Sequence, residues 1–247
     1  MDREGNAVEV KSLRKTFGPQ RVLNGINLQV RFGETLTVLG RSGTGKSVLL
    51  KLIVGLQKPD SGTVTIKGQD IASLSREELN EVRKKIGFLF QQAALYDSLS
   101  VEENVEFSLK RHTRMSAGER KDRVRSLLAQ VGMEQDSRKM PSQISGGMQK
   151  RVGLARALAL KPDILLFDEP TTGLDPITAG EIDELILQVE ERRNTASIVV
   201  THDLHSARTI SDRLAMVHEG NILAEGTFED LKNSQDEFVS RFLGEAA

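Results

Sequence analysis

A glycine-rich segment between two apolar runs is the first place in this sequence where residue types and spacing could do chemistry. The segment GRSGTGKS, residues 40–47, fits the pattern G-x-x-x-x-G-K-[ST], with a β-rich run before it and a helical run after it. Glycines there let backbone N–H groups surround phosphates, while Lys46 neutralises phosphate charge and Ser47 binds Mg²⁺. We therefore predict a phosphate site made of Gly40, Arg41, Ser42, Gly43, Thr44, Gly45, Lys46, Ser47 and Val48.

Two acidic residues end a second apolar run. Asp168 and Glu169 follow ILLF, residues 164–167, and precede Pro170, which places them at the end of a predicted strand rather than on an ordinary surface turn. From there Asp168 can hold Mg²⁺ through water, and Glu169 can polarise an attacking water molecule. The pair therefore indicates catalysis next to bound phosphates.

Two other polar residues also stand at predicted strand ends. His202 ends the run SIVVTH, where it could meet the γ-phosphate and the water, although a single histidine is more often structural. Gln91 follows IGFLF, where its amide could reach Mg²⁺ or water, and a plain polar loop is the alternative. Phe17 lies in a turn of a chain with only 4% aromatic residues, so its ring either stacks on adenine or packs in the core.

A second group of small residues, Ser145, Gly146 and Gly147, directly precedes a strongly helical run. Free backbone N–H groups and the positive end of the helix dipole meet at such a position, and glycines let an anion approach the backbone closely. The sequence thus predicts a second anion site, distant along the chain from the first.

The elements that must position these residues follow from hydrophobic periodicity and turn residues. We expect short β-rich runs in residues 1–39 that end in a buried strand at 35–39, and almost continuous helix over 100–140. The other predicted elements are a helix from 46, a strand within 59–71, a charged helix and a strand within 76–90, strands at 164–167 and 197–202 with a helix at 178–193 between them, a hairpin at 213–226 with a turn that contains Asn221, and an amphipathic tail at 233–247.

Composition limits the class of protein. The 247 residues are 38% hydrophobic and 28% charged with a net charge of -1, which predicts an ordinary soluble protein and gives no electrostatic support for binding nucleic acid. The absence of cysteine excludes disulfides and thiolate metal sites and fits a reducing cytoplasm. The N-terminal segment is too charged for a secretion signal, and no stretch approaches the roughly 20 apolar residues that cross a bilayer.

Taken together, these motifs resemble the ATP-binding cassette (ABC) ATPase family over essentially the whole chain. In that family GRSGTGKS is the Walker A loop, ILLFDEP is Walker B with its catalytic glutamate, and ISGGMQ is the signature motif. Gln91 falls on the Q-loop, GLD at 173–175 on the D-loop, His202 on the switch histidine, and Phe17 on the adenine-stacking aromatic, which is usually a Tyr. The resemblance implies catalytic roles for Glu169, His202 and Gln91, with Mg²⁺ held by Ser47, Gln91 and Asp168.

The fold that the resemblance implies is α/β: a P-loop NTPase core with a RecA-like mixed sheet, an antiparallel N-terminal β subdomain and an inserted helical subdomain. Residues 1–247 would form one ABC ATPase domain. Its expected parts are an α/β core at 1–92 and 160–230, a helical subdomain at 93–159 and a C-terminal amphipathic tail at 231–247.

Finer details are similar to the ATPases of MCE-type lipid transporters, the maintenance-of-lipid-asymmetry (Mla) group: Val48 after the Walker serine, the Met after SGG, and the closing DEFVSRFLGE. Ile144 and Met148 depart from the usual signature L-S-G-G-Q, and a methionine cannot make the hydrogen bonds of a glutamine.

The resemblance also implies partners. They are ATP with Mg²⁺, a second copy of the chain in a C2 dimer with ATP between Walker A of one chain and the signature of the other, integral membrane permease subunits, and an MCE-domain lipid-binding protein. The chain would then act at the cytoplasmic face of the inner membrane. Alternatives are an ABC ATPase for amino acids or metal chelates, a soluble ABC protein acting on nucleic acid, and a P-loop small-molecule kinase, which needs no signature motif.

Overall fold

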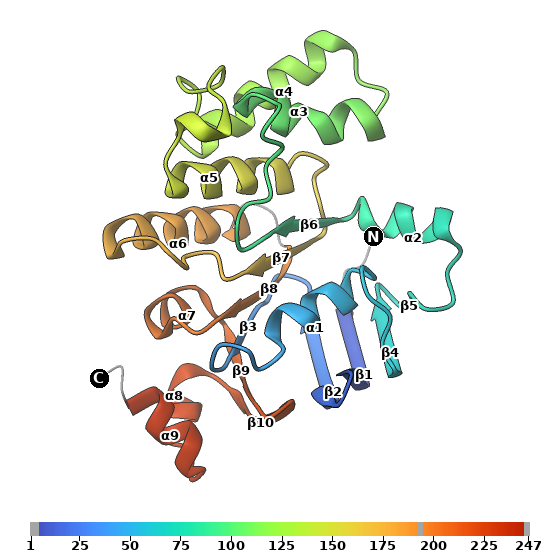
Figure 1. Cartoon of the computed structure of the whole chain (residues 1–247), viewed down its shortest axis with the longest axis vertical. Helices are drawn as coiled ribbons and strands as arrows, with labels where there is room; N and C mark the ends of the chain where they lie inside the picture. The colour runs from blue at the N-terminus through green and yellow to red at the C-terminus, as the bar shows by residue number, and fades with distance from the viewer. Residues whose placement is uncertain (1–4, 192–194, 245–247) are drawn as a thin grey trace.

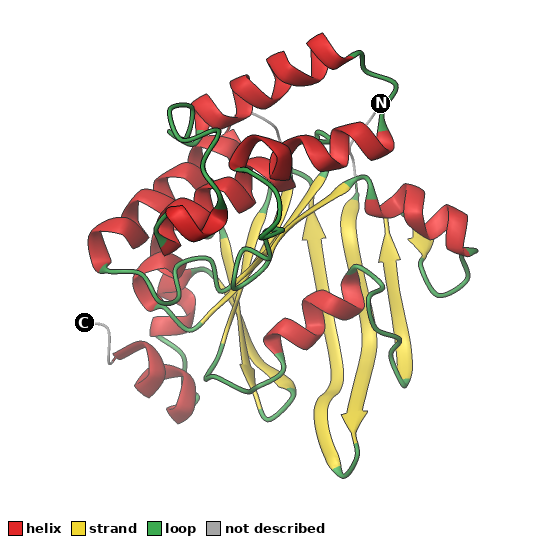
Figure 2. Ribbon diagram, turned by 45° about the horizontal axis from the view of Figure 1, so that its top comes forward, coloured by secondary structure: helices red, strands yellow, loops and turns green. Residues whose placement is uncertain are grey.

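Two β-sheets with helices around them make up the protein (Figures 1 and 2). The structure, a computed structural model, describes residues 5–191 and 195–244. The larger sheet has the strand order β10-β9-β3-β8-β7-β6, and the smaller has the order β2-β1-β4-β5. The strands are β1 (Asn6–Phe17), β2 (Gln20–Arg31), β3 (Thr35–Leu39), β4 (Ser61–Ile66), β5 (Gln69–Asp70), β6 (Ile86–Leu89), β7 (Ile164–Asp168), β8 (Ala196–Thr201), β9 (Arg213–His218) and β10 (Asn221–Gly226).

The helices connect and cover these strands. They are α1 (Lys46–Ile53), α2 (Arg76–Arg83), α3 (Val101–His112), α4 (Ala117–Gln130), the 3₁₀ turn η1 (Pro141–Gln143), α5 (Gly146–Ala157), α6 (Pro176–Glu191), α7 (Leu204–Ile210), α8 (Phe228–Lys232) and α9 (Glu237–Gly244). Within the described ranges, no helix combines the length and the apolar character that crossing a bilayer requires.

The larger sheet decides where polar strand ends meet. Strands β6, β7, β8 and β3 are neighbours and run parallel, and β9 continues the parallel order while β10 pairs with β9 in the antiparallel sense. Every residue of β3, β7 and β8 is buried because both faces of the sheet are covered, which explains why most of their residues are apolar. The carboxyl ends of four adjacent strands therefore share one edge.

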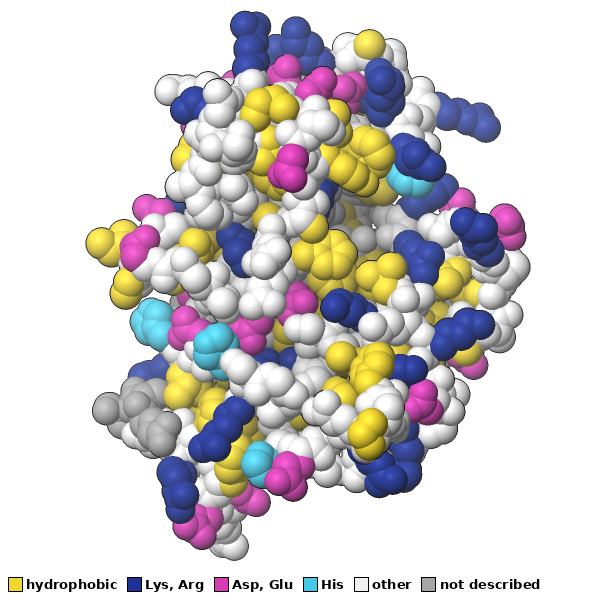
Figure 3. Space-filling model, in the orientation of Figure 1, with side chains coloured by type: hydrophobic (Ala, Val, Ile, Leu, Met, Phe, Trp, Pro, Cys, Tyr) yellow, Lys and Arg dark blue, Asp and Glu magenta, His cyan; other side chains and the backbone are white. Residues whose placement is uncertain are grey.

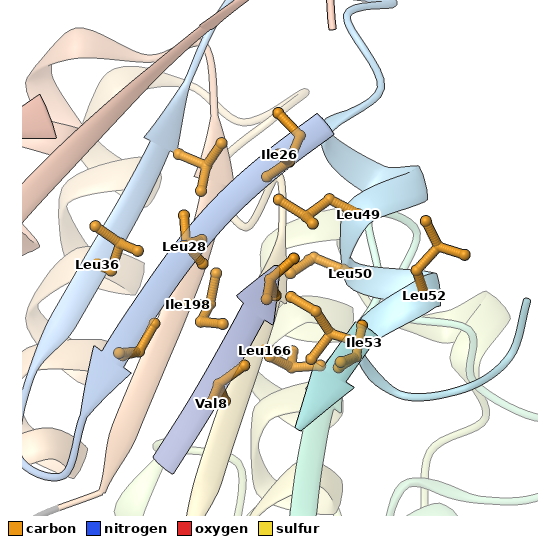
Figure 4. Close-up of a cluster of buried hydrophobic side chains, with 14 of the residues drawn as sticks. Val8, Ile26, Leu28, Leu36, Leu49, Leu50, Leu52, Ile53, Leu166 and Ile198 are labelled. Atoms are coloured by element: carbon orange, nitrogen blue, oxygen red, sulfur yellow. The ribbon is translucent and has the colours of Figure 1, made fainter. Parts of the chain in front are cut away.

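Helix α1 lies between the two sheets and closes the first hydrophobic core. Leu49 and Leu50 of α1 pack with Leu28 of β2, Leu166 of β7 and Ile198 of β8 (Figure 4). Because α1 begins directly after the glycine-rich segment, this packing anchors one end of the predicted phosphate loop.

A second core joins α3, α4, α5 and α6 to the far side of the larger sheet, with Val105, Leu127, Val152 and Phe167 among its buried members. Ser100 and Ser116 cap α3 and α4: each hydroxyl accepts from the N–H of the glutamate three residues on, and the carboxylate of that glutamate accepts from the serine N–H. Figure 1 shows α3 and α4 beyond α5, at the end of the molecule opposite to β10.

Most predicted elements are confirmed, and two details are wrong. The predicted near-continuous helix over 100–140 is interrupted at 113–116, because α3 ends there and Ser116 caps the start of α4. The helix then ends at Gln130, because Gly132 has a left-handed backbone with φ 68°. Residues 69–70, expected as a turn, form the short strand β5 against β4. The last two residues of the helix predicted at 178–193, and residues 245–247 of the predicted tail, lie outside the described residues.

The C-terminal helices pack under the glycine-rich segment. Val239 and Leu243 of α9 are buried in a third cluster with Met216 of β9 and Leu39, the last residue of β3. The last residue of β3 therefore packs against α9, directly before the glycine-rich segment.

Candidate active site

The glycine-rich segment is a loop from β3 to α1 whose glycines cannot be replaced without strain. A Cβ on Gly40 would lie 2.5 Å from the carbonyl oxygen of Val217, and one on Gly45 would lie 2.6 Å from Cγ1 of Val22. Gly43 and Gly45 also have φ values of 81° and 92°, a backbone conformation that side chains disfavour. The loop is thus a close-fitting cradle of main-chain groups, as phosphate binding requires.

Lys46 lies inside this loop. Its side chain is almost fully buried, and Nζ donates to the carbonyl oxygens of Gly40 and Arg41 at 2.7 and 3.0 Å. Nζ is also 3.4 Å from Oε1 of Glu169. Burial lowers the pKa of Lys46 below its ordinary value, and the charge of Glu169 opposes that shift. Among the described residues, the ammonium group is held by two neutral carbonyls and one carboxylate, all of which phosphate oxygens can replace.

Ser47 and Asp168 form the part of the site suited to a cation. Ser47 Oγ donates to Asp168 Oδ1 at 2.6 Å, which joins the start of α1 to the end of β7. Burial raises the pKa of Asp168, and the hydrogen bond from Ser47 opposes that shift. No group of three His, Asp or Glu side chains within the described residues could hold a metal by itself. A hydroxyl beside one carboxylate fits Mg²⁺, which binds through one or two protein oxygens together with substrate phosphates.

Glu169 is held in an unusual backbone conformation. Its φ is 48°, in the left-handed region that costs a non-glycine residue roughly 1–2 kcal/mol. Its N–H donates to the carbonyl of Val200 at 2.9 Å, and Thr172 Oγ1 donates to Oε2 at 2.9 Å. The surrounding bonds thus aim the carboxylate toward the phosphate loop rather than along the strand.

His202 supports the same carboxylate. Its Nδ1 lies 2.8 Å from Oε2 of Glu169, and since a carboxylate can only accept a hydrogen bond, Nδ1 carries the proton. The side chain is 47% exposed, which leaves the other ring nitrogen free to face a substrate. His202 and Glu169 therefore form one unit across β7 and β8.

Gln91 completes the group. It is exposed and lies two residues beyond β6, where it lines a common pocket of about 520 Å³ with Lys46, Ser47 and Glu169. The other lining residues are Gln20, Val22, Ser42, Gly43, Gly45 and Val48. The ends of β3, β6, β7 and β8 thus bring together the residues that the sequence places at four separate strand ends.

Asp168 and His202 join this pocket through hydrogen bonds to Ser47 and Glu169, whereas Phe17 and the residues at 145–147 do not line it. Phe17, 44% exposed, pairs in register with Gln20, which does line the pocket. Ser145 caps α5 by accepting from the N–H of Met148 at 3.2 Å, and neither Ser145 nor the two glycines after it line the pocket. The predicted second anion site is therefore separate from the pocket at the chain's own phosphate loop.

The side chain of Met148 is half-buried and packs against the core of the helical segment. The neighbouring Gln149 uses its amide within the chain, donating to the carbonyl of Pro141 at 3.0 Å. Met148 thus contributes packing at the start of α5, a role that needs no polar group.

Sequence reasoning missed one residue at the site. Lys150 of α5 is buried, and its Nζ donates to the main-chain carbonyl of Glu169 at 2.9 Å. Burial lowers the pKa of Lys150 to about 8, against the opposing charges of Asp168 and Glu169. The sequence signal was weak, because a lysine in a charged helix is normally a surface residue.

The fold and the site are those of a P-loop ATPase: a mainly parallel sheet whose strand ends bring together a glycine-rich loop, a hydroxyl bonded to a carboxylate, and a glutamate bonded to a histidine. Comparison with known proteins identifies the family. The family model described as ABC transporter matches residues 23–172, so the chain belongs to the ABC transporter family and is its ATP-hydrolysing, ATP-binding subunit.

Individual relatives cover nearly the whole chain. It is 43% identical over 238 residues to "Intermembrane phospholipid transport system ATP-binding protein MlaF" of Haemophilus influenzae, covering 96% of this chain and 90% of that protein. It is 41% identical to "Probable ribonucleotide transport ATP-binding protein mkl" of Mycobacterium leprae, covering 97% of this chain and 69% of that protein.

A solved dimeric ATP-binding cassette, in a post-hydrolysis state bound to ADP and phosphate, matches with a TM-score of 0.83 and 37% identity over 89% of this chain and 98% of that one. These comparisons confirm the predicted family and fold class. The roles assigned to single residues remain predictions.

Proposed function

We propose that this chain drives phospholipid transport, as the ATPase of an MCE-type system at the cytoplasmic face of the inner membrane. The observation that carries this proposal is the 43% identity to the phospholipid transport protein, which extends over 90% of that protein's length. The relative named for ribonucleotide transport favours a second candidate cargo. Both proposals use the same ATP site.

In the proposed reaction the loop at 40–48 binds the phosphates of ATP, and Lys46 moves from the carbonyls of Gly40 and Arg41 to the β- and γ-phosphates. Ser47, Asp168 and Gln91 would hold Mg²⁺, which neutralises charge on the phosphates. The oxygen of the attacking water bonds to the γ-phosphorus while Glu169 accepts a proton from that water. The bond between the γ-phosphorus and the bridging oxygen breaks, and ADP leaves with that oxygen. His202 keeps the carboxylate of Glu169 oriented during this transfer.

A second copy of the chain would complete each site. Ser145, Gly146 and Gly147 form an anion-binding helix start that does not reach the phosphate loop of their own chain. The dimeric state of the similar cassette supports a C2 dimer in which each signature helix contacts the partner's γ-phosphate. Loss of that phosphate then removes the bridge between the copies, and the dimer opens.

A permease subunit would dock in the groove between α2 and α3. This groove of about 640 Å³ is lined by Phe88, Phe90, Tyr96, Phe107 and the basic residues Arg83, Lys84, Arg111 and Arg156, among others. The rings of Phe88 and Phe90 stack with their centroids 4.1 Å apart, and the ring centroids of Tyr96 and Phe107 are 4.7 Å apart. Hydrophobic and basic side chains gather over this part of the face in Figure 3. An apolar segment of a membrane protein fits such a surface.

The groove adjoins the Gln91 segment, which would pass the motion on. Arg156 of α5 donates to the carbonyls of Ala93 and Ala94, both at 2.7 Å, and both alanines have left-handed φ values of 55° and 49°. A permease in the groove would thus touch a strained segment tied to both Gln91 and the signature helix.

Replacement of Glu169 by glutamine tests the ATP site. Glu169→Gln should leave ATP binding and ATP-driven dimerisation intact and lower turnover by more than about a hundredfold, because an amide cannot accept the proton. Ser145→Arg should spare ATP binding by the monomer and block dimerisation. Size-exclusion chromatography with and without ATP measures dimerisation, and the rate of phosphate release measures turnover. A Glu169→Gln variant with near wild-type turnover would contradict the general-base role.

The cargo needs a separate experiment. The chain is purified together with its membrane complex, and the bound small molecules are identified by mass spectrometry. Phospholipid in the complex is the expected result, and bound ribonucleotide without lipid would favour the second candidate.

A further inference from the structure

Lys150 is a buried charge placed behind the catalytic carboxylate. The residue lies on α5, its side chain is 5% exposed, and its Nζ donates to the main-chain oxygen of Glu169 at 2.9 Å. Removing an ammonium group from water is costly, and a methionine or leucine would fill the same space without that cost. The position of this lysine therefore calls for a role other than packing.

The bond fixes the peptide that aims Glu169. The N–H of Glu169 is bound to β8 through Val200, and its carbonyl oxygen is bound to α5 through Lys150. Between these two attachments the backbone holds its left-handed φ of 48°. Because this strained conformation directs the carboxylate toward Lys46 and His202, the bond from Lys150 contributes to the orientation of the catalytic group.

The same helix begins at the second anion site. Lys150 lies five residues after Ser145, or about 7.5 Å along the axis of α5, so the two move together as parts of one rigid helix. Gly153 holds this part of α5 close to the sheet, since a Cβ there would lie 2.7 Å from Leu89 of β6. A shift of the helix start must therefore displace Lys150 relative to Glu169.

We propose that Lys150 is a positioning residue that ties the orientation of Glu169 to the position of the signature helix in the same chain. This inference rests on the proposed dimer, in which the start of α5 contacts the ATP of the partner. Each α5 then touches two sites: the partner's γ-phosphate through Ser145 and its own chain's water-activating glutamate through Lys150. Engagement of one ATP thereby sets the geometry for hydrolysis of the other.

Lys150→Met tests this role in the full-length protein. Methionine keeps the length of the apolar stem, and the carbonyl of Glu169 keeps the bond from the N–H of Thr172 at 3.3 Å, so we expect an unchanged or higher melting temperature. We expect KM for ATP and ATP-driven dimerisation to stay at wild-type values while kcat falls by at least about tenfold, since displacing a catalytic group by about 1 Å can cost on the order of a hundredfold.

Arg151→Met is the matched control on the same helix. Arg151 bonds to the carbonyl of Val131 and to Glu181 and makes neither of its bonds to Glu169, so its loss should lower the melting temperature and leave kcat within about twofold. The proposal is overturned if Lys150→Met keeps kcat within twofold, or if both variants lose kcat in proportion to their loss of stability. Glu169→Gln distinguishes failure of this inference from failure of the proposed function. Normal turnover by Lys150→Met beside an inactive Glu169→Gln would contradict only the role of Lys150. An active Glu169→Gln would contradict the proposed ATP site.

Discussion

Replacing Asp183 with asparagine should stabilise this protein at neutral pH, because the carboxyl group of Asp183 is buried without adequate partners. The residue lies on α6 and is 1% exposed, and neither of its oxygens has a hydrogen bond of ordinary geometry among the described residues. Burial raises the pKa of Asp183 from 3.8 to about 6, with the hydroxyl of Ser206 opposing the shift and the charge of Asp203 adding to it. The folded protein therefore favours the neutral form of this group.

The size of the effect follows from the two pKa values. Below pH 3.8 the group is neutral in both the folded and the unfolded chain, and its favourable contribution is fully present. As the pH rises through about 6, only the folded chain must ionise a buried carboxyl, and about 3 kcal/mol of the free energy of unfolding is lost. Asparagine imitates the neutral acid in size and cannot ionise, so Asp183→Asn should regain about 3 kcal/mol at pH 7.5, or roughly 6–12 °C in melting temperature.

Urea unfolding at two pH values measures this difference. The gain of Asp183→Asn over the wild type should be about 3 kcal/mol at pH 7.5 and about half of that at pH 5. Glu184→Gln, the exposed neighbour on the same helix, is the control and should change the free energy of unfolding by less than about 0.5 kcal/mol at either pH. No gain at pH 7.5, or an equal gain at both pH values, would refute the argument that ionisation of Asp183 costs stability.

Two other predictions concern the phosphate loop. Gly45→Ala places a Cβ 2.6 Å from Val22 and forces alanine to φ 92°, so we expect at least about a tenfold weaker affinity for ATP and a loss of stability of about 1–3 kcal/mol, measured by ATP titration and urea unfolding. Wild-type affinity would show that the loop tolerates a side chain there. Phe238→Leu keeps an apolar side chain on α9 but removes the aromatic ring, whose centroid lies 5.5 Å from the guanidinium of Arg41. Without that ring Arg41 and the phosphate loop are less ordered before ATP binds, so binding costs more conformational entropy. KM for ATP should rise about two- to fivefold with kcat unchanged, and an identical KM, or the same rise in an Arg41→Ala background, would contradict this role.

Much of the local structure could be predicted because it depends on neighbours along the chain. The strand at 35–39, the helix after the glycine-rich segment and the hairpin at 213–226 follow from short-range periodicity and turn residues, and the structure has them at those places. The prediction of helix over 131–140 was wrong. The composition of that stretch is charged and compatible with a helix, but the end of the helix depends on the backbone conformation of a single glycine, Gly132. The strand β5 was missed because two residues pair only when another strand is already beside them.

The sequence by itself determined which chemistry is available: the spacing of the phosphate loop, the acidic pair after an apolar strand, and a second helix start rich in small residues. Because each of these signals lies within a few consecutive residues, it can be recognised in the sequence without knowledge of the fold. Only the tertiary structure decided that the ends of β3, β6 and β7 share one pocket, that His202 after β8 bonds to Glu169 at that pocket, that Ser145 lies outside it, and that Lys150 and Asp183 are buried. Strand order and burial arise from contacts between residues far apart in the chain, and a charged residue on a helix has the same local pattern whether it faces water or a main-chain carbonyl in the interior.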